Sequence, residues 1–175
     1  MKVFNFRLDG KIRNETGQRP FMEFHEKAQS PDNCIFVNPE GMDYGYFDGI
    51  LIFSAKIFLP ADIGKLILVG ISNFGEEYES IKKAKLYTMK EISFEGLEET
   101  CNAVMAASRE YKRLLLSISL DVLDRAFYPK GSIGGMTTRQ LIYMIQRLKL
   151  VKNILAVQIL GEDEELTKKI ILELA

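Results

Sequence analysis

The chain has 175 residues, of which 47% are hydrophobic and 27% are charged. A chain of this length can bury the core of one domain, and no linker or low-complexity run divides it. We therefore predict a single domain over residues 1–175. The 23 lysines and arginines nearly balance the 24 aspartates and glutamates, leaving a net charge of -1. This balance gives no reason to expect nucleic acid or an anionic membrane as a partner.

The cysteines and the apolar stretches indicate the cellular setting. Cys34 and Cys101 are too few for a disulfide framework or a zinc site. The longest apolar stretch, residues 50–59, is interrupted by Ser54 and Lys56 and falls short of the ~20 residues that span a bilayer. The first residues contain no apolar core of signal-peptide length. We therefore expect a reduced, cytoplasmic protein.

The predicted elements are less distinct in the first 60 residues than later in the chain. Strands are predicted at residues 3–8 and 34–37, and a short helix at residues 20–28. Residues 46–58 stay ambiguous, although their β-branched content favours a strand.

From about residue 65 the pattern alternates between strand and helix. Strands are predicted at residues 65–71, 85–89, 114–120 and 153–160, and helices at residues 74–84, 94–112, from Thr137 onward, and 164–174. The expected N-caps are Ser93, Thr137 (in a capping box with Gln140) and Asp163. This alternation with short loops implies a parallel sheet with helices on both faces. Functional sites in such sheets form where the strands end.

The most informative stretch is the end of the predicted strand at residues 114–120. Residues 117–129 read Ser-Ile-Ser-Leu-Asp-Val-Leu-Asp-Arg-Ala-Phe-Tyr-Pro, and Gly-Gly-Met-Thr follows at 134–137. This run resembles the metal-binding signature of the ureohydrolase family (arginase, agmatinase and formimidoglutamase). That signature reads Ser-h-Asp-h-Asp-h-h-Asp-Pro-x-h-x-Pro, with h apolar, followed by Gly-Gly-h-Thr. Ser119 stands in place of the first Asp, and Arg125 in place of the first Pro.

A second stretch extends the resemblance toward the N-terminus. Residues 69–77 read Val-Gly-Ile-Ser-Asn-Phe-Gly-Glu-Glu, similar to the family's Val-Gly-Ile-Arg-x-x-x-Glu-Glu. The likeness covers roughly residues 65–175. It implies a three-layer α/β/α sandwich with a mainly parallel sheet, of the arginase/deacetylase type and shortened at the N-terminus. It also implies a helix within residues 46–58, and self-association or pairing with a related subunit.

The resemblance further implies a specific chemistry and a specific set of ligands. Ureohydrolases split a guanidinium carbon–nitrogen bond with a hydroxide that bridges two Mn²⁺ ions. Their four Asp and two His ligands come from the motifs Gly-Gly-Asp-His, Asp-Ala-His-x-Asp and Asp-x-Asp. This chain has no Gly-Gly-Asp-His, and its one histidine, His25, matches no family motif. We expect no cofactor, and manganese if any is bound.

The remaining candidate metal ligands are Asp121, Asp124 and Asp43. Asp121 keeps the second Asp of the Asp-x-Asp motif, or the first in an alignment with a two-residue deletion. The expected place of Asp-Ala-His-x-Asp follows residues 34–37, where Asn38 and Glu40 stand at its first and third positions. The alternative is structural, because Asp121 and Asp124 follow a buried strand and can accept N–H bonds from the loop.

The position of the family's substrate carboxylate also differs. After its last strand the family has Asp-h-h-Glu-h-Asn-Pro, whose Glu faces the cationic group of the substrate. Here Gly161 is aligned with that Glu, so Glu162 is the candidate for binding substrate. Losing metal ligands and this carboxylate together favours a non-catalytic homologue that binds a small cationic or amide ligand or acts as a subunit. The alternatives are a metal-assisted amidinohydrolase or amidohydrolase with a rebuilt site, and a small-molecule sensor.

Overall fold

The computed structural model describes residues 2–5, 34–39, 44–57, 65–72 and 84–174. The predicted helix at residues 20–28 lies outside these ranges, as do residues 74–83 of the next predicted helix. His25, Glu40 and Asp43 lie outside them too.

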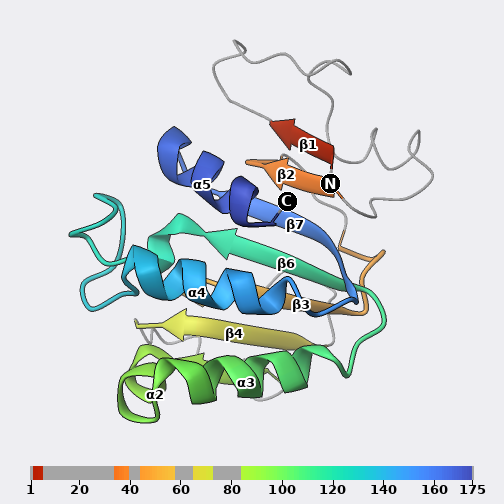
Figure 1. The fold of residues 1–175 in the computed structure, drawn as a ribbon, viewed down its shortest axis with the longest axis horizontal. Helices are drawn as coiled ribbons and strands as arrows, with labels where there is room; N and C mark the ends of the chain where they lie inside the picture. Colours follow the sequence, from red (N-terminus) through yellow and green to blue (C-terminus); the bar gives the residue numbers. More distant parts are fainter. Residues whose placement is uncertain (1, 6–33, 40–43, 58–64, 73–83, 175) are drawn as a thin grey trace.

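The described strands form one parallel sheet (Figure 1). They are β1 (Lys2–Asn5), β2 (Cys34–Val37), β3 (Gly49–Phe53), β4 (Leu66–Ile71), β5 (Lys85–Thr88), β6 (Leu114–Ser119) and β7 (Ile154–Leu160). Their order in the sheet is β1-β2-β7-β6-β3-β4-β5, and each neighbouring pair is parallel. The predicted α/β fold with a parallel sheet is confirmed. All five residues of β3 are buried between β4 and β6, so the strand interpretation of residues 46–58 is correct and the implied helix is wrong.

The described helices all lie on one face of this sheet (Figure 1). They are α2 (Met89–Phe94), α3 (Leu97–Ser108), α4 (Thr138–Leu148) and α5 (Glu164–Leu174), with a short 3₁₀ turn at Leu120–Val122. Their apolar side chains pack against one set of alternating strand residues, including Leu51, Leu116 and Val157. The intervening residues, such as Ile52 and Leu115, form a second core on the opposite face. None of these described helices has the length and apolar character that crossing a bilayer requires.

Local side-chain bonds explain where the helices begin. The Thr137 hydroxyl accepts a hydrogen bond from the Gln140 backbone N–H at 3.2 Å. The Thr137 backbone N–H donates to Gln140 Oε1 at 2.8 Å, which confirms the predicted capping box. Asp163 accepts from Leu166 N–H at 2.8 Å, as expected of an N-cap. The prediction of one helix at residues 94–112 capped by Ser93 is wrong. α2 ends at Phe94 and α3 begins at Leu97, and the positive φ of Gly96 (97°) separates the two helices.

Candidate functional site at the carboxyl ends of the strands

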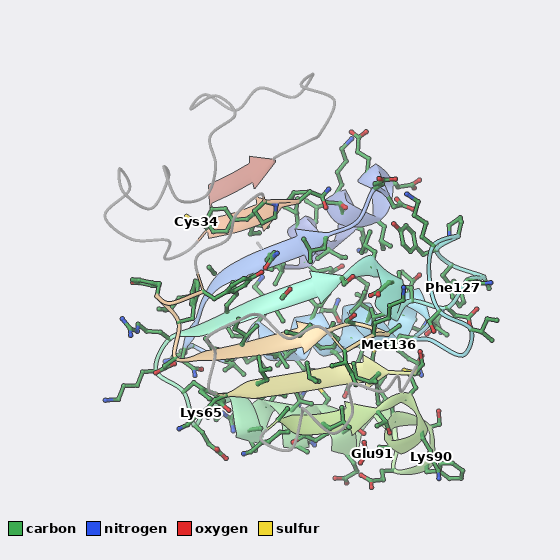
Figure 2. The ribbon with its side chains drawn as sticks, turned by 180° about the vertical axis from the view of Figure 1, so that it is seen from behind. Cys34, Lys65, Lys90, Glu91, Phe127 and Met136 are labelled. Atoms are coloured by element: carbon green, nitrogen blue, oxygen red, sulfur yellow. The ribbon has the colours of Figure 1, made fainter. Side chains whose placement is uncertain are left out.

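The end of β6 meets the end of β3. Ser54, the first residue after β3, donates from Oγ to both carboxylate oxygens of Asp121, at 3.1 and 3.3 Å. The Ala55 N–H donates to the same carboxylate at 3.4 Å. Because the sheet is parallel, all its strands end at this edge, which in Figure 2 is the side of Phe127 and Met136. Asp121 therefore lies where an α/β sheet places its functional residues, and its carboxylate is held by neighbouring donors.

Asp124 organises the loop that follows β6. Its carboxylate accepts hydrogen bonds from the Ala126 N–H at 2.9 Å and the Gly134 N–H at 2.8 Å. These bonds lower the pKa of Asp124, because they stabilise the charged form. Its backbone N–H donates to Met136 O at 2.8 Å, which joins the two sides of the loop. Asp124 thus holds the loop through both its side chain and its backbone.

The lowered pKa of Asp124 makes a pH-dependent prediction. A group whose folded pKa lies below its ordinary value, 3.8 here, contributes stability above that value and loses it as the pH falls through the folded pKa. Asp124→Asn is therefore expected to be less stable than the wild type at neutral pH, and the difference is expected to narrow in acid below the ordinary value. Urea unfolding at a series of pH values measures this. If the difference in unfolding free energy between wild type and Asp124→Asn stayed constant at every acidic pH measured, the Asp124 charge would not contribute to stability.

Glu162 lies outside this cluster. Its side chain is exposed and forms an ion pair with Lys130, while its backbone N–H donates to Tyr128 Oη at 3.3 Å. The neighbouring Gly161 exchanges two hydrogen bonds with the Asn38 side chain, at 2.7 and 2.8 Å. A Cβ at position 161 would lie 2.5 Å from Leu120 Cδ1. Position 161 therefore excludes a side chain, and no glutamate there can reach a substrate without moving Leu120.

The predicted place of the Asp-Ala-His-x-Asp motif, after residues 34–37, does not adjoin the strand that leads to Asp121. Asn38, after β2, binds Gly161, and β7 separates β2 from β6. The strand on the other side of β6 is β3, and the residue after its end, Ser54, contacts Asp121. There the sequence reads Ser54-Ala55-Lys56-Ile57, which retains only the alanine of the motif. Among the residues that the structure describes, no three His, Cys, Asp or Glu side chains gather as a metal-binding group.

The sequence interpretation missed Gln158. This residue lies in β7 opposite Ser117 of β6 and is only 3% exposed. Its side chain hydrogen-bonds Tyr44, which opposes the rise in the pKa of Tyr44 that burial causes. The signal was available, because Gln158 is the one strongly polar side chain inside the apolar run of β7. When residues 155–161 are aligned with the family's Asp-h-h-Glu-h-Asn-Pro, Gln158 stands at the position of the Glu.

The fold and the site together define the class of protein. It is an α/β protein with a parallel sheet, a glycine-rich loop after a central strand and polar residues at the strand ends. Residues 40–160 match the model of the Arginase family. The match covers more than half of the chain, so the chain belongs to this family and the predicted ureohydrolase resemblance is confirmed. No curated protein matches it in sequence.

Solved structures show the same fold. An arginase from Bacillus caldovelox superposes with a TM-score of 0.71 at 16% identity, covering 87% of this chain and 70% of its own. A formimidoylglutamase from Bacillus subtilis gives 0.62 at 18% identity, covering 81% and 58%. An agmatine ureohydrolase of Thermoplasma volcanium gives 0.61 at 15% identity, covering 81% and 60%. At such identities the likeness shows the fold alone.

Proposed function

We propose that this chain is a ureohydrolase-like protein that lacks the dinuclear manganese site and acts as a non-catalytic binding or subunit-like protein. The observation that carries the proposal is the residue set at the paired ends of β3 and β6. Ser54 and Lys56 stand where the family motif has Asp and His, and Ser119 stands where it has Asp. Among the metal-ligand positions at these two strand ends, Asp121 alone has the carboxylate of the family motif.

This residue set does not fit two manganese ions. Two divalent cations close together repel, and several carboxylates with imidazoles must offset that charge. Ser54 and Ser119 bring no charge, and Lys56 adds a positive one. The Asp121 carboxylate already accepts bonds from Ser54 and Ala55, so binding a metal would cost those contacts. The proposed function therefore involves no metal-bound hydroxide.

The subunit-like part of the proposal is supported by apolar side chains near the same edge. Ile133 is 76% exposed and Phe127 is 48% exposed, and both lie in the loop after β6. Apolar side chains that form a contiguous exposed patch are typical of surfaces that meet a partner. We propose a second copy or a related subunit as the partner, a small cationic or amide compound as the ligand, and the cytoplasm as the location.

Elemental analysis after incubation with excess Mn²⁺ and gel filtration tests the proposal. We expect far less than one equivalent of manganese per chain, while an arginase with intact motifs carried through the same steps retains its metal. Light scattering on the eluted peak gives the oligomeric state of the same sample.

Two results would contradict this expectation in different ways. Nearly two equivalents would restore the classical mechanism. About one equivalent that disappears in Asp121→Ala would favour a metal-assisted amidinohydrolase or amidohydrolase with a rebuilt site.

A further inference from the structure

A polar patch interrupts the apolar face of the sheet opposite to the helices. Figure 2 looks onto this face. Three of its buried strand and strand-end residues are polar: Ser54, Ser117 and Gln158, which are 4%, 5% and 3% exposed. Ser117 pairs in register with Gln158, and Ser54 follows directly after β3, the neighbour of β6. Gln158 and Ser117 therefore lie side by side, and Ser54 lies on the same face, two residues beyond Ile52, which pairs with Ser117. We call these three residues the polar patch.

Gln158 has an unused acceptor. Its Oε1 is buried, and no hydrogen-bond partner for it exists within the described part of the chain. Because Oε1 has no partner, the hydrogen bond that the Gln158 side chain makes with Tyr44 goes through the amide nitrogen. Leaving a buried amide oxygen unsatisfied is costly, so native proteins nearly always supply a donor. The missing donor points to a bound molecule.

The charges around the polar patch limit what that molecule can be. Glutamine carries no charge, and neither serine does. The nearby carboxylate of Asp121 is engaged by Ser54 and Ala55. A cation brought to Gln158 would lose its hydration without gaining a free carboxylate from the described residues, which is costly in a buried place. An uncharged ligand that donates an N–H avoids that cost.

We propose that the polar patch binds a small uncharged ligand through a primary carboxamide group. The ligand's NH₂ donates to Gln158 Oε1, and its carbonyl oxygen accepts from the Ser117 hydroxyl. Tyr44, which is partly exposed, connects the Gln158 amide with the surface. The proposal rests on the proposed binding function, and it makes Gln158 the residue that selects a neutral ligand over a cation.

Two small probes of similar shape test this selection. Acetamide and methylguanidinium are titrated separately into isotopically labelled protein in EDTA, and the ¹H–¹⁵N spectrum is followed, including the Gln158 side-chain NH₂. We expect saturable shifts with acetamide centred on Gln158 and Ser117. Methylguanidinium is expected to bind at least about tenfold more weakly, a factor that corresponds to ~1.4 kcal/mol.

Three variants sharpen the test. Gln158→Leu keeps the volume and should abolish the response to acetamide, while Gln146→Leu, an exposed control on α4, should retain it. Gln158→Glu should reverse the order of the two probes, because a buried carboxylate favours a cation. If Gln158→Leu fails to fold, Gln158→Glu still tests the selection.

Two outcomes overturn the proposal: a folded wild type that shows no saturable response to acetamide, or one that binds methylguanidinium more tightly. Because EDTA is present throughout, the result does not depend on metal content. Two equivalents of manganese in the elemental analysis would instead overturn the proposed function, whatever the probes do.

Discussion

Gly135→Ala is expected to destabilise the protein by about 3 kcal/mol, the upper end of the usual cost of overpacking. An added Cβ would lie 2.6 Å from Val122 O, 2.7 Å from Leu123 C and 2.8 Å from Asp124 N. These are backbone atoms, so rotating a side chain cannot relieve the contacts. The same segment is held by the bonds from Met136 N–H to Val122 O and from Asp124 N–H to Met136 O, both 2.8 Å. The loop after β6 must therefore open, and urea unfolding measures the loss.

The preceding glycine is the matched control. Gly134 has a φ of 74°, but nothing lies within 4 Å of its Cβ position. Gly134→Ala should therefore cost only the ~1–2 kcal/mol of the left-handed conformation. If both variants lost the same stability, the backbone contacts at Gly135 would not be what packs this loop.

The sequence predicted the later strands and caps because their determinants are local. The apolar run that became β6 needs both faces covered, and it does form a central strand. The capping box of Thr137 depends on two residues three positions apart, so it was visible without a structure. Gly96 was missed because a single glycine carries little signal against a continuing helical pattern.

The candidate site was harder to predict because it depends on the order of the strands. β2 and β3 are both short apolar runs followed by polar residues, so sequence alone does not say which of them adjoins β6. The structure places β7 between β2 and β6, which directs Asn38 to Gly161 and brings Ser54 to Asp121. Contacts of this kind join residues far apart in the chain, and no local pattern reveals them.

Glu162 was predicted and Gln158 was missed for a related reason. Glu162 looked suitable because it is charged and adjoins the aligned position, but it lies past the end of β7 and binds Lys130 on the surface. Gln158 lies on the face of the sheet opposite to the helices, because side chains in a strand alternate between faces. Which face held the polar patch became clear only from the pairing of Gln158 with Ser117.

The triple variant Ser54→Asp, Lys56→His, Ser119→Asp is expected to gain stability from manganese that the wild type does not gain. Ser54 Oγ lies 3.1 and 3.3 Å from the Asp121 oxygens, so a carboxylate at position 54 would lie beside that of Asp121. An imidazole at position 56 and a carboxylate at position 119 would complete a set of ligands of the kinds that the family uses. At free Mn²⁺ one hundred times the dissociation constant, the gain is about 2.7 kcal/mol. Thermal unfolding with Mn²⁺ or EDTA measures it.

The same substitutions should have the opposite effect without metal, and that reversal makes the test specific. In EDTA the added carboxylates repel Asp121 and remove the Ser54 hydrogen bond, so the triple variant should be less stable than the wild type. Lys56→His alone adds no carboxylate and should respond to neither condition. If the triple variant folds but stays insensitive to Mn²⁺, the ends of β3 and β6 no longer hold the geometry of a metal site. The loss would then lie in the backbone as well as in the side chains that now occupy it.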